Sequence, residues 1–194
     1  TAYEIYQCDW SSDVCSSDLY DIQYELSRDS EGRSVLKTTE KITATFSQQD
    51  KNHGIERAIP SSYDGHPVSL SIGSVTNENG QSVEYSTRED NGNTVVRIGD
   101  PSQYAHGDKT YVLTYTQRDV TRFYQDTGKD EWYWDTNGTG WRVPISQLTV
   151  SIRLDGELAS LTGTPSCYVG AQGATNSCDL QQQADGSYRT SASN

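Results

Sequence analysis

The chain has 194 residues with 27 acidic against 15 basic side chains, so its formal net charge at pH 7 is −12. This length suffices for one domain with a buried core, and the negative charge excludes a protein that binds nucleic acid mainly by neutralising phosphates. No stretch approaches the ~18 consecutive apolar residues of a transmembrane helix. Because the sequence opens without methionine or a signal-like apolar run, we expect a piece of a longer protein.

The first nineteen residues differ from the rest of the chain. They follow neither the strand nor the helix period, and they carry four acidic residues and no basic one. Thr1–Ile5 and Asp9–Leu19 back-translate into the two constant blocks of a sequencing-library adapter, with Tyr6–Gln7 at the place of its variable index. We interpret residues 1–19 as a non-native, disordered segment, a flexible acidic arm being the alternative. The remaining residues, 20–194, have 23 acidic and 15 basic side chains, a net charge of −8.

From residue 20 onward, apolar and polar residues alternate in several runs. The alternation covers residues 22–26, 42–46, 68–72, 111–115 and 148–154. A period of two indicates strands with one buried face and one solvent-exposed face, which is typical of antiparallel sheets.

Turn signals separate these runs. Asn77–Gly80 and Asn91–Asn93 predict hairpin turns because Asn and Gly tolerate positive φ, and weaker signals follow at 29–32 and 184–186. No window shows a sustained helical stripe. We therefore predict a single all-β domain over 20–194, an antiparallel β-sandwich with little or no helix, with an open β-barrel as the alternative. The polar run at the end predicts truncation before the last strand.

Three stretches carry a family resemblance. They are His53–Pro60, Val96–Asp100 with Tyr111–Tyr115, and Asp130–Asp135 followed by Gly138, Trp141, Pro144 and Ile145. In these stretches the chain resembles the N-terminal extracytoplasmic domain of a predicted bacterial membrane protein family, Domain of Unknown Function 2207. The resemblance implies a signal peptide upstream, transmembrane helices downstream, and membrane attachment through these missing segments. It transfers no catalytic residue.

Two cysteines support the same compartment. Cys167 and Cys178 bracket a glycine-containing turn and close a loop of twelve residues. A disulfide there would contribute about 3 kcal/mol in the chain-entropy model and would persist only in an oxidising space. Two unrelated free thiols are the alternative. The pair, with the resemblance, predicts a disulfide and a location on the extracytoplasmic face of the bacterial cell membrane.

An aromatic cluster is the main candidate for a ligand site. If residues 130–135 form a strand, Trp132 and Trp134 share one face, and the other face carries Glu131, Tyr133 and Asp135. The cluster is either a platform for sugar rings or part of the core, with Trp141 closing one end.

Arg57 is expected either to pair with a buried acid such as Glu131 or to lie over an aromatic ring. The candidate ligand-binding residues are therefore Trp132, Tyr133, Trp134, Trp141, Glu131 and Arg57.

No pattern of metal-ligating or nucleophilic residues points to a reaction. Acidic and amide side chains at 126–137 could offer oxygen ligands to Ca²⁺, but they lack the spacing of a calcium loop. A solvated acidic face is the favoured interpretation of these residues. His53, His66 and His106 lack zinc-ligand spacing, and G-x-S-x-G is absent. We predict no catalytic residue, metal or cofactor.

The function predicted from the sequence is a non-catalytic extracytoplasmic interaction module of a membrane-anchored protein, which binds an envelope protein or cell-wall glycan and no nucleic acid. One alternative is a glycan-directed enzyme that uses acids near residues 130–135. A second alternative is a structural spacer.

Overall fold

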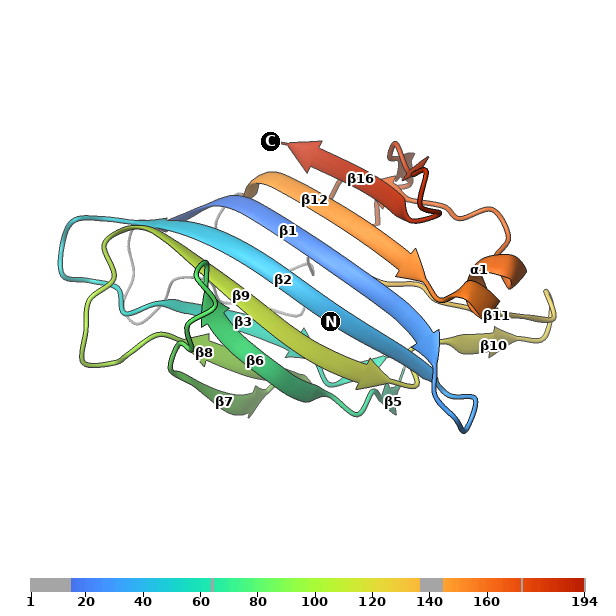
Figure 1. Cartoon of the computed structure of the whole chain (residues 1–194), viewed down its shortest axis with the longest axis horizontal. Coiled ribbons are helices and arrows are strands. Elements are labelled where there is room, and N and C mark those ends of the chain that lie inside the picture. The colour runs from blue at the N-terminus through green and yellow to red at the C-terminus, as the bar shows by residue number, and fades with distance from the viewer. Residues whose placement is uncertain (1–14, 64, 137–144, 172, 194) are drawn as a thin grey trace.

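The computed structural model describes residues 15–63, 65–136, 145–171 and 173–193. Its regular structure is almost entirely β-strand, with one short helix, α1 (Gly156–Leu161) (Figure 1). The prediction of an all-β domain with little helix is confirmed.

A seven-stranded sheet forms the larger layer, in the order β15-β16-β12-β1-β2-β9-β6. Its strands are β1 (Cys15–Arg28), β2 (Ser34–Phe46), β6 (Ser71–Asn77), β9 (Gly107–Arg118), β12 (Ile145–Leu154), β15 (Gln181–Gln182) and β16 (Tyr188–Ser193). Neighbouring strands are antiparallel except β1 and β12, which run parallel. A parallel pair needs a long crossover, which the intervening strands provide, and alternation within a strand does not reveal it.

A three-stranded antiparallel sheet forms the smaller layer, in the order β3-β8-β7. Its strands are β3 (Ile55–Pro60), β7 (Tyr85–Asp90) and β8 (Asn93–Ile98). Asn91 and Gly92 connect β7 to β8 with φ of 48° and 75°, as a two-residue hairpin turn requires, so the predicted turn is confirmed. Three short pairs complete the described strands: β4 (Ser62–Tyr63) with β5 (His66–Pro67), β10 (Arg122–Tyr124) with β11 (Lys129–Glu131), and β13 (Tyr168–Val169) with β14 (Asn176–Ser177).

One hydrophobic core joins the two layers. Every second residue of β1 from Tyr20 to Leu26 is buried, as is every second residue of β2. Ile55 and Ile59 of the small sheet belong to the same core cluster as these residues. The sandwich is therefore confirmed, and period-two alternation in β1 and β2 contributes to it, because each of these strands turns one mostly apolar face to the opposite sheet.

Two predicted strands are shorter than the alternation suggested. Within 68–72, only Ser71 onward belongs to β6, because Ser69 has a φ of 42° that interrupts the extended backbone. The Val68 amide instead donates to the Ser61 carbonyl. Within 130–135, β11 ends at Glu131, and the residues beyond it have no ladder partner in the described chain.

The N-terminal end of β1 also differs from expectation. The strand begins at Cys15, which lies opposite Phe46 in the ladder with β2, so residues 15–19 belong to the sheet although residues 1–19 were expected to be disordered. Backbone hydrogen bonds can extend an antiparallel ladder with little regard to side chains. Residues 1–14 lie outside the described ranges, and the non-native origin of 1–19 stays a prediction.

Buried tyrosines give the fold an expected alkaline limit. Burial raises the pKa of the Tyr111 phenol from 10.0 to about 12 and raises the pKa values of Tyr20, Tyr24 and Tyr115 as well. A phenol whose pKa is higher in the folded state than in the unfolded state contributes stability below the unfolded value, and this contribution disappears as pH rises through the folded value. We expect the free energy of unfolding, measured with urea, to fall as pH rises from 10 to about 12. The fall should be shallower in Tyr111→Phe, and an unchanged free energy across this interval would contradict the expectation.

Candidate functional site

The β10–β11 hairpin lies at the end of the sandwich where β1 and β9 finish (Figure 1). Arg28, the last residue of β1, forms an ion pair with Asp130 of β11, with 3.7 Å between nitrogen and oxygen. The chain that follows β11 runs back against the core. This end of the molecule contains most of the residues that the sequence singled out.

Trp132 and Trp134 are half-buried and pack against the core. The Trp132 ring meets Tyr24 edge-on with 5.5 Å between centroids, and it stacks on Trp134 at 6.4 Å. The Tyr24 hydroxyl donates to the Thr136 carbonyl at 3.1 Å, which fixes this segment to β1. The two indoles therefore anchor the segment by packing, as buried aromatic rings do. Trp141 lies outside the described residues.

Tyr133 of the anchored segment has two further tyrosines and an arginine nearby. We call these four residues the tyrosine cluster: Tyr63, Tyr124, Tyr133 and Arg122. The Tyr63 ring lies 5.5 Å from Trp134. Partial burial raises the pKa of Tyr63, the nearby Tyr124 and Tyr133 phenols add to this effect, and the Tyr133 backbone forms a hydrogen bond with the Tyr63 side chain. The Arg122 guanidinium carbon lies 5.4 Å from the centre of the Tyr124 ring, a cation–π contact. Tyr133 is 59% exposed.

Burial alternates along the segment that carries Tyr133. Glu131, Tyr133 and Asp135 are exposed, whereas the two tryptophans between them are half-buried. The alternation was predicted, although β11 supplies a ladder only as far as Glu131, which faces Arg122 in register. The exposed aromatic side chain of this segment is thus a tyrosine between two carboxylates.

Arg57 lies in the centre of the core and not at this end. Its Nε and Nη2 donate to the two carboxylate oxygens of Glu40, each at 2.8 Å, and Tyr115 donates to the same carboxylate at 2.7 Å. Both charged side chains are almost completely buried. Arg57 thus pairs with a buried acid, as predicted, but Glu131 as that acid was wrong, because Glu131 is exposed on β11 while Glu40 faces β3 from the adjacent layer. The alternative of an aromatic contact holds in part, since the guanidinium also lies 6.0 Å from the Tyr20 ring centre.

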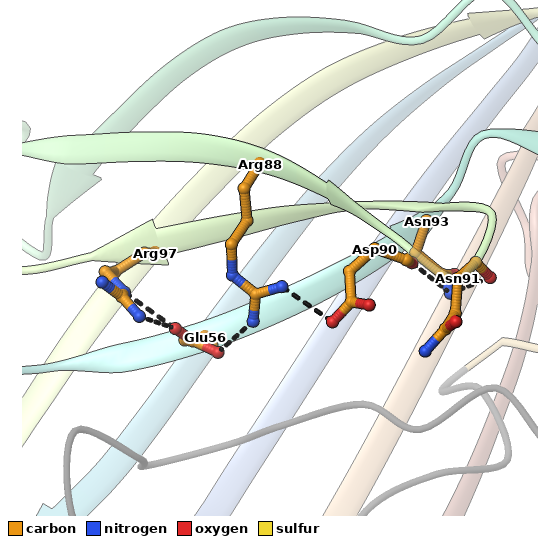
Figure 2. Close-up of polar contacts among 6 residues, drawn as sticks. All are labelled: Glu56, Arg88, Asp90, Asn91, Asn93 and Arg97. Atoms are coloured by element: carbon orange, nitrogen blue, oxygen red, sulfur yellow. Dashed lines mark hydrogen bonds and ion pairs between the residues drawn. The ribbon is translucent and has the colours of Figure 1, made fainter.

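A second ion-pair network lies on the other face of the small sheet. Figure 2 shows Arg88 of β7 and Arg97 of β8 converging on the carboxylate of Glu56 of β3, at 3.1 Å and 2.7 Å. Arg88 also donates to Asp90 at 2.7 Å. The network joins all three strands and balances two positive with two negative charges. We assign it a structural role.

Cys167 and Cys178 form the predicted disulfide. It closes the β13–β14 hairpin, whose Tyr168 side chain is 55% exposed. Two of the histidines lie near one tyrosine ring: His53 bonds to the Gln103 carbonyl, His106 pairs with Asp50 at 2.9 Å, and the Tyr104 ring centre lies 4.4 Å from the His53 ring and 6.5 Å from the His106 ring. In the described ranges, no group of three or more His, Cys, Asp or Glu side chains could hold a metal ion.

Sequence reasoning therefore found one part of this site and missed another. It identified Tyr133 and Glu131 from the unusual aromatic run. It missed Tyr63, which lies on β4 and is far from Tyr133 in the sequence. It also missed Arg122 and Tyr124, which lie on the separate short strand β10. The turn spacing around a hairpin gives a weak signal for residues 122–124, and nothing in the sequence connects Tyr63 with them.

Comparison with solved structures finds a similar fold within a larger protein. Leukotriene A4 hydrolase from Saccharomyces cerevisiae matches with a TM-score of 0.53 and 12% identity, over 92% of this chain and 27% of that chain. An M1 zinc metallopeptidase from Deinococcus radiodurans matches with a TM-score of 0.47 and 11% identity, over 92% of this chain and 38% of that chain. The chain thus spans well under half of either protein, and the likeness to the yeast hydrolase concerns the fold alone.

No curated protein matches the sequence. In the part of the chain that the structure describes, no helix has the length and apolar character of a membrane span. The family comparison, by contrast, covers residues 17–194, nearly the whole chain. Because this match covers nearly all of the described fold, the chain belongs to the DUF2207 family, described as the N-terminal domain of a predicted membrane protein.

Proposed function

We propose that this domain is a non-catalytic interaction module on the extracytoplasmic face of the bacterial cell membrane, where it binds another envelope protein through the tyrosine cluster. The family description supports attachment to a membrane. The disulfide between Cys167 and Cys178 supports an oxidising compartment, because cytosolic reductants keep most thiols reduced.

The observation that carries the proposal is the anchored exposure of Tyr133. Tyr133 is 59% exposed, whereas Trp132 and Trp134 on either side of it in the sequence pack against the core. Tyr, Trp and Arg are the residues most enriched at protein interfaces, and side chains that are already held in place lose little entropy on binding. The tyrosine cluster combines these residue types on a rigid base.

The glycan reading receives less support. It relied on Trp132 and Trp134 as an open stacking platform, and both indoles turn toward Tyr24 and Tyr63. A protein partner can bind to tyrosine rings and a guanidinium group, and it does not need an exposed tryptophan surface.

The proposal is tested by crosslinking inside the native host. A photo-crosslinking amino acid replaces Tyr133 in the full-length membrane protein, and a matched variant carries it at Thr39, on the outer face of the large sheet. We expect a discrete adduct with an envelope protein from position 133 and none from position 39. An adduct that muramidase shortens would instead show glycan binding, and the absence of any adduct at position 133 would leave the spacer reading; either result contradicts the proposal.

A further inference from the structure

The exposed face of residues 131–135 places an aromatic ring between two carboxylates. Glu131, Tyr133 and Asp135 all point away from the core, since the residues between them are half-buried against it. Burial that alternates in this way is what an extended chain produces, in which residues two apart lie on the same side, about 6.5–7 Å from each other. A group that lies on the Tyr133 ring would therefore have a carboxylate on each side.

The cluster already contains one cation on one tyrosine. Arg122 lies over Tyr124, with its guanidinium carbon 5.4 Å from the ring centre. Tyr133 is the most exposed tyrosine of the cluster, and Tyr63 contacts the Trp134 ring beside it and forms a hydrogen bond with the Tyr133 backbone. The electron-rich face of a tyrosine attracts ammonium and guanidinium groups, and nearby carboxylates strengthen this attraction.

The charge around the cluster favours the same kind of partner. Residues 122–135 contain four acidic and two basic side chains, and residues 20–194 have a net charge of −8. Such a surface repels the anionic headgroups of a lipid bilayer and attracts a basic protein segment. The site combines two attractions for a cation: the face of the exposed tyrosine ring and the negative charge of the flanking carboxylates.

We propose that the protein partner presents a lysine or arginine side chain to the face of Tyr133, between Glu131 and Asp135. This inference rests on the function proposed above and names the chemistry of its binding site. The cation exchanges part of its hydration for the ring face, and Glu131 and Asp135 compensate its charge. The surrounding tyrosines then contact the aliphatic stem of the same side chain.

Nuclear magnetic resonance titration of the full chain with tetralysine, and with fully acetylated tetralysine as the neutral probe, tests the inference. We expect tetralysine to shift the signals of Tyr133 and its neighbours, with the acetylated peptide at least about threefold weaker. Tyr133→Phe, which keeps the ring, should retain this affinity, whereas Tyr133→Leu should lose about threefold. Tyr85→Leu is the matched control, because Tyr85 is 41% exposed on another part of the surface.

Three outcomes would overturn the inference: equal binding of the two peptides, equal affinity of Tyr133→Phe and Tyr133→Leu, or shifts at Tyr133 produced by phosphatidylglycerol vesicles. A protein adduct at position 133 in the crosslinking experiment, together with no preference for the charged peptide, would leave the proposed function standing and remove only this inference.

Discussion

Replacing Arg57 with leucine should lower the free energy of unfolding by about 3–5 kcal/mol, because the variant leaves the Glu40 carboxylate buried without its counter-charge. The Glu40 side chain is fully buried, and Arg57 supplies two of its hydrogen bonds. Urea unfolding followed by tryptophan fluorescence measures the effect. The loss should exceed that of most single substitutions in this chain, since desolvating an unpaired charge is more costly than removing one packed methylene group.

Two further variants separate charge pairing from simple loss of volume. The double variant Glu40→Leu/Arg57→Leu should be clearly more stable than Arg57→Leu, because an apolar pair of similar size replaces a buried ion pair at little cost. Arg153→Leu serves as the exposed control: its ion pair with Asp185 lies at the surface, and its loss should cost less than about 1 kcal/mol. If Arg57→Leu costs no more than Arg153→Leu, Glu40 does not depend on Arg57 in the folded state.

The second large effect is expected at two glycines that hold β3 against the end of β8. Gly54 has a φ of 148° and Gly99 a φ of 132°, and a Cβ on Gly54 would overlap the Ile98 carbonyl oxygen, while a Cβ on Gly99 would overlap the His53 carbonyl oxygen. Backbone atoms cannot move aside as a side chain can. Gly54→Ala or Gly99→Ala should therefore cost about 3–5 kcal/mol through strain and overpacking together.

Gly163→Ala is the control for this pair. Gly163 has no positive φ, and its added Cβ would meet no atom within 4 Å. Its substitution should change the free energy of unfolding by less than about 0.5 kcal/mol in the same urea experiment. Equal stability of Gly99→Ala and Gly163→Ala would show that the two backbones do not approach each other as closely as described.

Much of the fold could be predicted because alternation is a local property. The run from Ile22 to Leu26 and the run from Ile42 to Phe46 each identify a strand and its buried face without knowledge of any neighbour. The Asn91–Gly92 turn is local in the same sense. The parallel pairing of β1 with β12 joins residues more than a hundred positions apart, and no local pattern records which strands become neighbours.

The site shows the same division between local and distant information. Alternation along residues 131–135 separates exposed Tyr133 from the two anchoring tryptophans, and this follows from the sequence. The arrival of Tyr63 and Arg122 beside Tyr133 depends on how separate hairpins pack. The partner of Arg57 was missed for the same reason: Glu40 lies on a strand of the other sheet, and only the stacking of the two sheets brings its carboxylate to the guanidinium.

The sequence by itself predicted a β-sandwich that resembles the DUF2207 family, with a disulfide between Cys167 and Cys178, because periodicity, a rare aromatic run and a short cysteine loop are readable along one chain; the family match and the structure agree with these predictions. Tertiary structure decided which charges meet in the core and which tyrosines share a surface. Those contacts form between segments far apart in sequence, and their energies arise only after two sheets have excluded the water between them.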